Sequence, residues 1–306
     1  MLKTFRLVDG KLQEAGPEGF EVLVYTNPNV QEKDHLVGQF AIDEHTLNSS
    51  LDPEELGRVE FEAGHVAVIV KKPKRYCSKD NFLFKISSVG IFLFPEKLVI
   101  VAKDDEFVWE GRVFAKMQTI KDVFLSVIFS SVLHFEEHLK VIRKVSDELE
   151  QEINKAISNK DLLHMFKLEK SLVYYLDAIQ SNNKVTNKLK ASSLKLVFSQ
   201  EQQEFLDDII IEGGQCFQQA DSYSDVLSSM MDAWASIINN NLNVRLKRLT
   251  VVSICIMTPT FVVSLFSMNV PLPLPQHDTI LSFWIVTGMA VLSVFILLLV
   301  GYYKKL

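Results

Sequence analysis

Small hydroxyl side chains recur along an apolar stretch near the end of the sequence, residues 249–268. Counted in heptads from Asn243, two rows of residues share one stripe of a helix with a repeat of about 3.5 residues. The rows are Asn243, Thr250, Met257 and Ser264, and Leu246, Ser253, Thr260 and Ser267. We call these eight residues the polar stripe, because six of them are polar. The side-chain oxygens of these six polar residues can form hydrogen bonds with water. The stripe is therefore predicted to contact water or protein and not lipid.

Two interpretations of the polar stripe follow. Small hydroxyl residues favour close packing between membrane helices, and this is their commoner use. The stripe can instead line a hydrated path for an ion, since rings of hydroxyl and carbonyl oxygens select ions in channels. Because two spans cannot enclose a pore, the second interpretation requires several copies of the chain with their first spans inside.

The elements that would hold the stripe are two predicted membrane spans, residues 249–268 and 280–303, and each reaches the length of about 20 residues that a bilayer requires. The short connection 270–279 makes them an antiparallel hairpin. Basic residues flank its outer ends, and the connection has none: Arg245, Lys247, Arg248, Lys304 and Lys305. The positive-inside rule then predicts a multi-pass protein of the cell or inner membrane with both termini in the cytoplasm.

Composition narrows the class of protein further. The 306 residues suggest about two domains, and the formal net charge of −6 does not favour nucleic-acid binding. Three widely spaced cysteines, Cys77, Cys216 and Cys255, indicate neither a disulfide framework nor a zinc site. The N-terminus lacks the apolar core of a signal peptide. No nucleotide-binding motif is present, so we expect no organic cofactor and no ATP-driven step.

The first part of the chain, residues 1–117, reads as a cytoplasmic α/β domain. Short β-branched and aromatic runs predict strands at 66–70, 82–86 and 98–102. The segment around Pro95 and Glu96 predicts a turn that joins two strands.

Residues 118–248 are predicted to form long helices, and 249–306 the membrane hairpin. No proline occurs between Pro95 and Pro259, and proline costs about 3 kcal/mol inside a helix. Apolar spacing predicts an antiparallel helix pair at 119–158 and 161–191, and a third helix that starts near Ser199 and continues into the first span. The pair Gly213-Gly214 is the one weak point of this helix, where the chain can bend.

Two motifs suggest other chemistry. The run from His134 to His138 fits H-x-x-E-H, an inverted zinc-protease motif, but it lies on a charged segment and a solvated helix face is the better interpretation. Lysines and an arginine at 71–75 are likewise interpreted as a solvated loop. We therefore do not expect an enzyme.

The end of the stripe, Ser267-Met268-Asn269, resembles the Gly-Met-Asn signature of the CorA family of divalent-cation channels. The order of the parts is similar too: an α/β domain, long helices, a stalk helix continuous with the first span, and two spans at the C-terminus. Ser267 departs from the signature glycine. The connection carries His277 and Asp278 where relatives often have a glutamate.

The resemblance implies a homo-oligomer, a pentamer, that sits in the lipid bilayer and carries hydrated divalent cations, above all magnesium. It implies that Asn269 forms an oxygen ring at the pore mouth, and that Met257 and Leu249 form apolar constrictions. Relatives with altered signatures include zinc transporters, so a zinc or cobalt/nickel transporter is an alternative. A non-conducting membrane-anchored structural or sensing protein is another.

The resemblance also implies regulation by cytoplasmic Mg²⁺ that bridges acidic groups of neighbouring subunits. Asp207 and Asp208 lie where relatives carry such an aspartate on the stalk. The partner carboxylate is expected among Asp104, Asp105 and Glu106. The alternative for each is a solvated surface charge.

Overall fold

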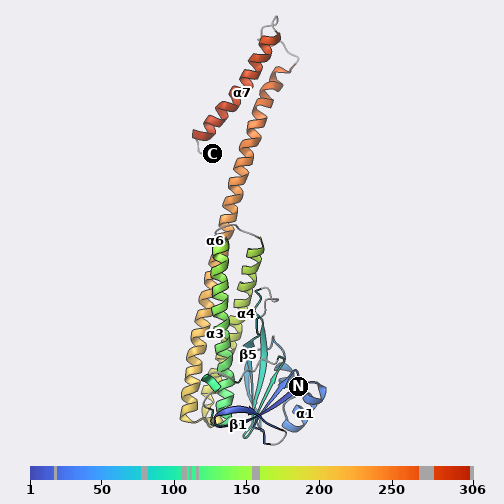
Figure 1. Cartoon of the computed structure of the whole chain (residues 1–306), viewed down its shortest axis with the longest axis vertical. Coiled ribbons are helices and arrows are strands. Elements are labelled where there is room, and N and C mark those ends of the chain that lie inside the picture. The colour runs from blue at the N-terminus through green and yellow to red at the C-terminus, as the bar shows by residue number, and fades with distance from the viewer. Residues whose placement is uncertain are drawn as a thin grey trace. The chain divides into compact units, whose positions relative to one another are not determined.

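The computed structural model describes residues 1–16, 19–76, 82–104, 109, 112–114, 117–153, 159–268 and 279–303. They divide into two compact units, Met1–Met231 and Asp232–Leu306. The N-terminal unit contains a seven-stranded sheet in the order β2-β1-β3-β7-β6-β5-β4 (Figure 1). Its strands are β1 Leu2–Val8, β2 Lys11–Glu14, β3 Val22–Thr26, β4 Arg58–Phe61, β5 Val66–Pro73, β6 Ile86–Leu93 and β7 Leu98–Ala102. Neighbouring strands are antiparallel except β3 and β7.

The central strands are buried on both faces, which explains why they read as continuous apolar runs in the sequence. The strands predicted at 66–70 and 98–102 are present, and the predicted turn is closed by a hydrogen bond from Phe94 N to Lys97 O of 2.9 Å. The strand predicted at 82–86 is wrong, because β6 begins only at Ile86. Phe84 instead packs in the core, and its N–H donates to Ser171 Oγ at 2.9 Å.

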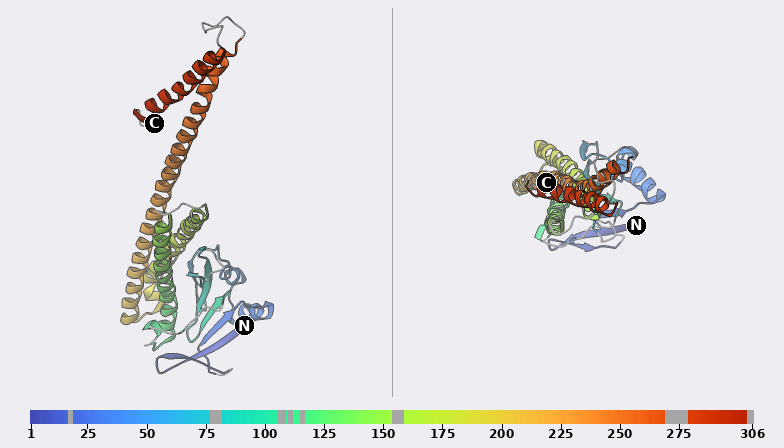
Figure 2. Two further views of the ribbon diagram at one scale, coloured as in Figure 1. Left: turned by 45° about the horizontal axis from the view of Figure 1, so that its top comes forward. Right: turned by 90° about the horizontal axis from the view of Figure 1, so that it is seen from above.

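Helices cover the two faces of this sheet (Figure 2). Short helices α1 Val30–Phe40 and α2 Glu44–Ser49 pack on one face, over a cluster that includes Tyr25 and Phe92. Long helices α3 Ile120–Ile153 and α4 Asn159–Ala191 pack against the other face and lie side by side. The short helix α5 Ser193–Leu196 follows α4.

Helix α6 runs from Gln200 to Phe266 without interruption, as predicted. Ser199 and Gln202 cap its start: Gln202 N donates to Ser199 Oγ at 3.2 Å, and Ser199 N donates to Gln202 Oε1 at 3.1 Å. The pair Gly213-Gly214 lies within this continuous helix. A Cβ atom there would lie 2.4 Å from Asn183 Oδ1, so this glycine permits close approach of α4 to α6.

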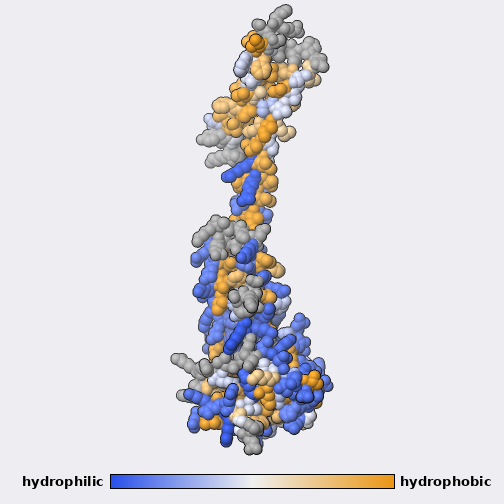
Figure 3. Space-filling view, turned by 45° about the vertical axis from the view of Figure 1, so that its right-hand side comes forward, coloured by the Kyte–Doolittle hydropathy of each residue, from blue (hydrophilic) through white to orange (hydrophobic). Residues whose placement is uncertain are grey.

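The C-terminal unit consists of the last part of α6 and helix α7 Thr279–Tyr303. Both are long and apolar enough to cross a membrane. In the most apolar stretch of each helix, 0% of the residues of α6 and 6% of the residues of α7 are buried inside the chain. The core helices of a water-soluble domain are instead mostly buried. Apolar side chains predominate on the face of these spans that Figure 3 shows. The predicted fold class, an α/β domain with long helices and two C-terminal spans, is confirmed.

Candidate ion pathway and regulatory residues

From Ser253 to Ser267 the polar stripe lies on the face of α6 that turns away from α7. In the described part of the C-terminal unit α7 is the only other helix, so half-buried positions on α6 mark the side towards it. Cys255, Thr258 and Val262 are half-buried, at three- and four-residue steps. Residues advance by about 100° each around a helix, which puts Ser253, Met257 and Thr260 on the opposite side. All eight stripe residues are exposed: Asn243, Leu246, Thr250, Ser253, Met257, Thr260, Ser264 and Ser267.

Hydroxyl groups of the stripe are hydrogen-bonded to their own helix. Thr250 Oγ1 donates to Leu246 O at 2.9 Å, and Thr260 Oγ1 donates to Ile256 O at 2.8 Å. These bonds satisfy the hydroxyl protons and leave the oxygen lone pairs as acceptors. The stripe therefore offers acceptors that suit the water shell of a cation, although the same bonds also make the hydroxyls tolerable at a helix contact.

A cavity of about 700 Å³ opens between α6 and α7 near the start of the first span. Asn243, Leu246 and Thr250 line it from α6. Leu297 and Gly301 line it from α7. Unlike the later part of the stripe, these three residues thus border the gap between α6 and α7.

The motif that ends the stripe is only partly described. Ser267 follows the last residue of α6, and its Oγ donates to Val263 O at 3.1 Å. Met268 is 54% exposed. Asn269 and the connection with His277 and Asp278 lie outside the described residues.

The acidic residues expected to take part in regulation lie on helix α6 and in the segment that follows β7. Asp207 accepts a hydrogen bond from Lys190 Nζ at 2.6 Å, and Asp208 beside it on α6 is exposed. Asp104 at the end of β7 pairs with Lys74 at 2.8 Å. Asp105 and Glu106 lie outside the described residues.

Carboxylates are suitable ligands for Mg²⁺, which prefers hard oxygen donors. The described residues of one chain nevertheless contain no group of three or more histidine, cysteine or acidic side chains that could hold a metal. A regulatory site built on Asp207 therefore fits only if another copy of the chain or water completes the ligand set.

The two histidines of the H-x-x-E-H motif do not lie on a solvated face, so that interpretation is wrong for them. His138 is buried, and its Nδ1 lies 2.7 Å from Tyr175 Oη. Burial lowers the pKa of His138 to about 4, and burial and then the neighbouring His138 lower the pKa of His134 to about 3. Glu137 is exposed. Neutral, packed histidines of this kind act as part of the core.

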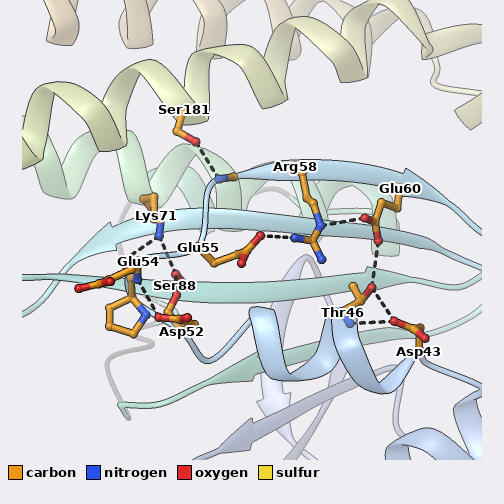
Figure 4. Close-up of polar contacts among 12 residues, drawn as sticks. Asp43, Thr46, Asp52, Glu54, Glu55, Arg58, Glu60, Lys71, Ser88 and Ser181 are labelled. Carbon is orange, nitrogen blue, oxygen red and sulfur yellow. Dashed lines mark hydrogen bonds and ion pairs between the residues drawn. The ribbon is translucent and has the colours of Figure 1, made fainter.

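The predicted solvated loop at 71–75 is wrong for Lys71 and Lys72, whereas Arg75 is exposed after the end of β5. Lys71 and Lys72 lie on β5 and are 4% and 8% exposed. The Lys71 ammonium donates to Pro53 O at 2.8 Å and Ser88 Oγ at 3.0 Å (Figure 4). Burial lowers the pKa of Lys71, and the carboxylates of the loop 52–55 oppose that shift. Lys71 is thus a structural link between the loop and the sheet.

Sequence inspection missed the partners of the acidic residues. Lys190 and Asp207 lie 17 positions apart in the sequence on different helices. The only sequence signal was the short connection between these helices, which brings the end of α4 close to the start of α6.

Comparison with known proteins agrees with the fold. Residues 18–305 match the family model described as "CorA-like Mg2+ transporter protein". The cobalt/magnesium transport protein CorA of Methanocaldococcus jannaschii is 26% identical over 316 residues, which cover 98% of this chain and 95% of that protein.

The fold is also similar to those of solved structures. The complete structure of the CorA magnesium transporter from Methanocaldococcus jannaschii superposes with a TM-score of 0.79 at 21% identity, covering 98% of this chain and 96% of that one. The ZntB cytoplasmic domain from Vibrio parahaemolyticus gives a TM-score of 0.52 at 11% identity, covering 76% of this chain and 98% of that one.

Proposed function

Because the chain belongs to the CorA-like Mg2+ transporter family, we propose that it is a homo-oligomeric membrane channel for hydrated divalent cations, with magnesium as the principal ion. Family membership makes the chain a membrane transporter of divalent cations. The relative from Methanocaldococcus jannaschii carries cobalt and magnesium in its name, which supports this choice of ions.

The observation that carries the proposal is the position of the polar stripe. Four polar side chains, Ser253, Thr260, Ser264 and Ser267, lie on the exposed face of α6 opposite the face that packs towards α7, and Asn243 and Thr250 border the cavity between the two helices. Polar side chains in a membrane should face protein or water. One copy supplies neither on that face, so several copies must surround it. We propose a pentamer with the α6 helices inside and the α7 helices towards lipid.

Ion selection is proposed to occur at the Asn269 end of the stripe. Magnesium sheds its water reluctantly, so a ring of amide oxygens can hold the hydrated ion by hydrogen bonds without stripping it. Ser267 replaces a glycine of the family signature and keeps a small side chain next to this ring.

Below that ring, Leu249 and Met257 are proposed to narrow the pore. They are 63% and 68% exposed in the single chain, so both side chains are free to meet their symmetry copies. Apolar constrictions can close a pore by excluding water. The polar rows between them would hold the water shell of the passing ion.

Regulation is proposed to act through the acidic residues. Mg²⁺ bound between subunits at Asp207 and Asp208, with a carboxylate from Asp104, Asp105 or Glu106, would hold the closed state. The basic residues beside both spans support an orientation with both termini in the cytoplasm. This side would then sense the internal magnesium concentration.

Cation uptake by the purified protein in liposomes tests the proposal. We expect uptake of Mg²⁺ in protein-containing liposomes and none in empty ones, and slower uptake with Mg²⁺ on the regulatory side. Uptake of Co²⁺, Ni²⁺ or Zn²⁺ in preference to Mg²⁺ would reassign the ion within the same fold. No uptake of any of these ions would favour a non-conducting membrane-anchored protein.

A further inference from the structure

One ion pair occupies the residue to which regulation is assigned. Lys190 in the last turn of α4 places its ammonium 2.6 Å from Oδ2 of Asp207 on α6. The same ammonium is 3.5 Å from Gln203 O. The two side chains are 34% and 52% exposed, so the pair is open to solvent. An ion that approaches Asp207 from solvent therefore meets a carboxylate that already has a cation on it.

We propose that Lys190 is a tethered competitor for the divalent cation at Asp207 and sets the magnesium concentration that closes the channel. This inference rests on the proposed function, which assigns Asp207 to regulation. The ligand class is a hard divalent cation, and the competing group belongs to the chain itself.

The competition follows from distance and charge. Mg²⁺ binds a carboxylate oxygen at about 2.0–2.1 Å, which would bring it close to the ammonium on the same group. Two cations at that separation repel each other. Lysine carries its charge on a flexible stem, so Lys190 can swing away into solvent. Each Mg²⁺ ion must then displace the ammonium, and the apparent affinity falls by the fraction of Asp207 that is paired.

The strength of the ion pair between Lys190 and Asp207 determines how far the half-saturating Mg²⁺ concentration shifts when Lys190 is removed. Exposed ion pairs contribute little to stability, so removal of Lys190 should lower the half-saturating Mg²⁺ concentration by about two- to fivefold. A shift of this size would move a regulatory threshold without abolishing the response.

Lys188 provides a matched control. It lies two residues earlier on α4, carries the same charge, and its ammonium donates to the backbone carbonyl of Val59 at 2.7 Å. Lys188→Met therefore removes one positive charge from the same helix without freeing a carboxylate. Lys190→Arg keeps the charge at the tested position.

The test uses the full-length protein. Limited proteolysis at increasing Mg²⁺ concentrations gives the half-protecting concentration, and liposome uptake gives the half-inhibiting one. Lys190→Met and Lys190→Gln should lower both by about two- to fivefold. Lys190→Arg and Lys188→Met should keep the wild-type values. In an Asp207→Asn background, Lys190→Met should cause no further change. Melting temperatures identify any variant that fails to fold.

Three results would contradict this inference. In the first, Mg²⁺ protects the wild type, but neither Lys190→Met nor Lys190→Gln shifts the half-protecting concentration. Lys190 then does not compete with Mg²⁺, and the proposed regulation stands. In the second, Lys188→Met shifts the half-protecting Mg²⁺ concentration as much as Lys190→Met does. The effect then comes from the net charge of the helix and not from the ion pair with Asp207. Wild-type protein that Mg²⁺ neither protects nor inhibits overturns the proposed regulation, and the competitor with it.

Discussion

The two units of the chain place their apolar side chains in different surroundings. Residues 1–231 bury large side chains such as Tyr25, Phe92 and Tyr175 within the chain itself. In the described part of residues 232–306 the buried apolar residues are Trp234 and Ala290. The N-terminal unit therefore carries its own core. The exposed apolar surface of the C-terminal unit fits the proposed contacts with lipid and with other copies of the chain.

The hydrogen-bond partners of polar side chains also differ between the two units. In the N-terminal unit Asn182 links three elements: its Nδ2 donates to Lys71 O at 2.8 Å and to Ser131 Oγ at 3.1 Å. In the stripe, Thr250 and Thr260 donate only to carbonyl groups of their own helix among the bonds described. Substitutions of buried residues in the first unit should thus change stability, and substitutions in the stripe should change ion flux.

The largest effect is expected at Asn269. Asn269→Ala removes one amide oxygen per subunit from the proposed ring, and each lost hydrogen bond costs about 0.5–1.5 kcal/mol. Several losses together should reduce cation flux by about a hundredfold, since 1.4 kcal/mol is a factor of ten. Size-exclusion chromatography should give the wild-type oligomer. Ser267→Gly, which restores the family signature, should retain flux. Normal flux in Asn269→Ala would remove this residue from ion selection.

A stability effect is expected at Tyr175, in the other unit. Tyr175 is fully buried against Phe135 and His138, so Tyr175→Ala should destabilise the protein by about 3–5 kcal/mol. Tyr174 is 47% exposed on the same helix, and Tyr174→Ala should have little effect. Thermal melting of both variants measures the difference. Equal melting temperatures would contradict the assignment of the core.

The pH dependence of stability should come from the N-terminal unit. The pKa of His138 is lowered from 6.5 to about 4 in the folded state, so the unfolded state binds the proton more tightly. Neutral His138 therefore contributes to the free energy of unfolding above pH 6.5. This contribution is lost as the pH falls from 6.5 towards 4, and the loss is up to about 3 kcal/mol. His138→Gln should flatten denaturant-derived stability over this window. An unchanged slope would show that His138 titrates normally.

The smallest effects are expected at neighbouring glycines of α6. Gly213→Ala would place its Cβ 2.4 Å from Asn183 Oδ1 and disturb the hydrogen bond from Asn183 Nδ2 to Gly213 O. It should cost about 1 kcal/mol. Gly214→Ala meets nothing within 4 Å and should stabilise the helix by about 1 kcal/mol. Melting shifts of the same sign would contradict the close approach of α4 to α6.

The long elements could be predicted from the sequence because their signals are local. The absence of proline and the steps between apolar residues predicted the start of α3 and the continuity of α6. The segment 82–86 shows the limit of such reasoning. Its aromatic run is typical of a strand, but Phe84 stacks on Tyr76 at 4.6 Å and contacts α4, and this packing overrides the local preference.

The site was less predictable because its contacts join distant parts of the chain. Lys71 and His138 look like solvated charges in the sequence, yet both are buried by helices that come later in the chain. The polar stripe was predictable, because a heptad spacing already defines one face of a helix. Its position opposite α7 depends on how the hairpin packs, which the spacing does not determine.

The central claim is that the polar stripe lines the ion path. Thr260→Cys puts a thiol on the stripe, while the native Cys255 lies half-buried on the α7 side and serves as an internal control. Liposomes are treated with a membrane-impermeant cationic thiol reagent before Mg²⁺ uptake is measured. We predict that the reagent blocks uptake in Thr260→Cys and leaves the wild type unaffected. Modification of Thr260→Cys, verified by mass spectrometry, with full uptake retained would contradict the claim.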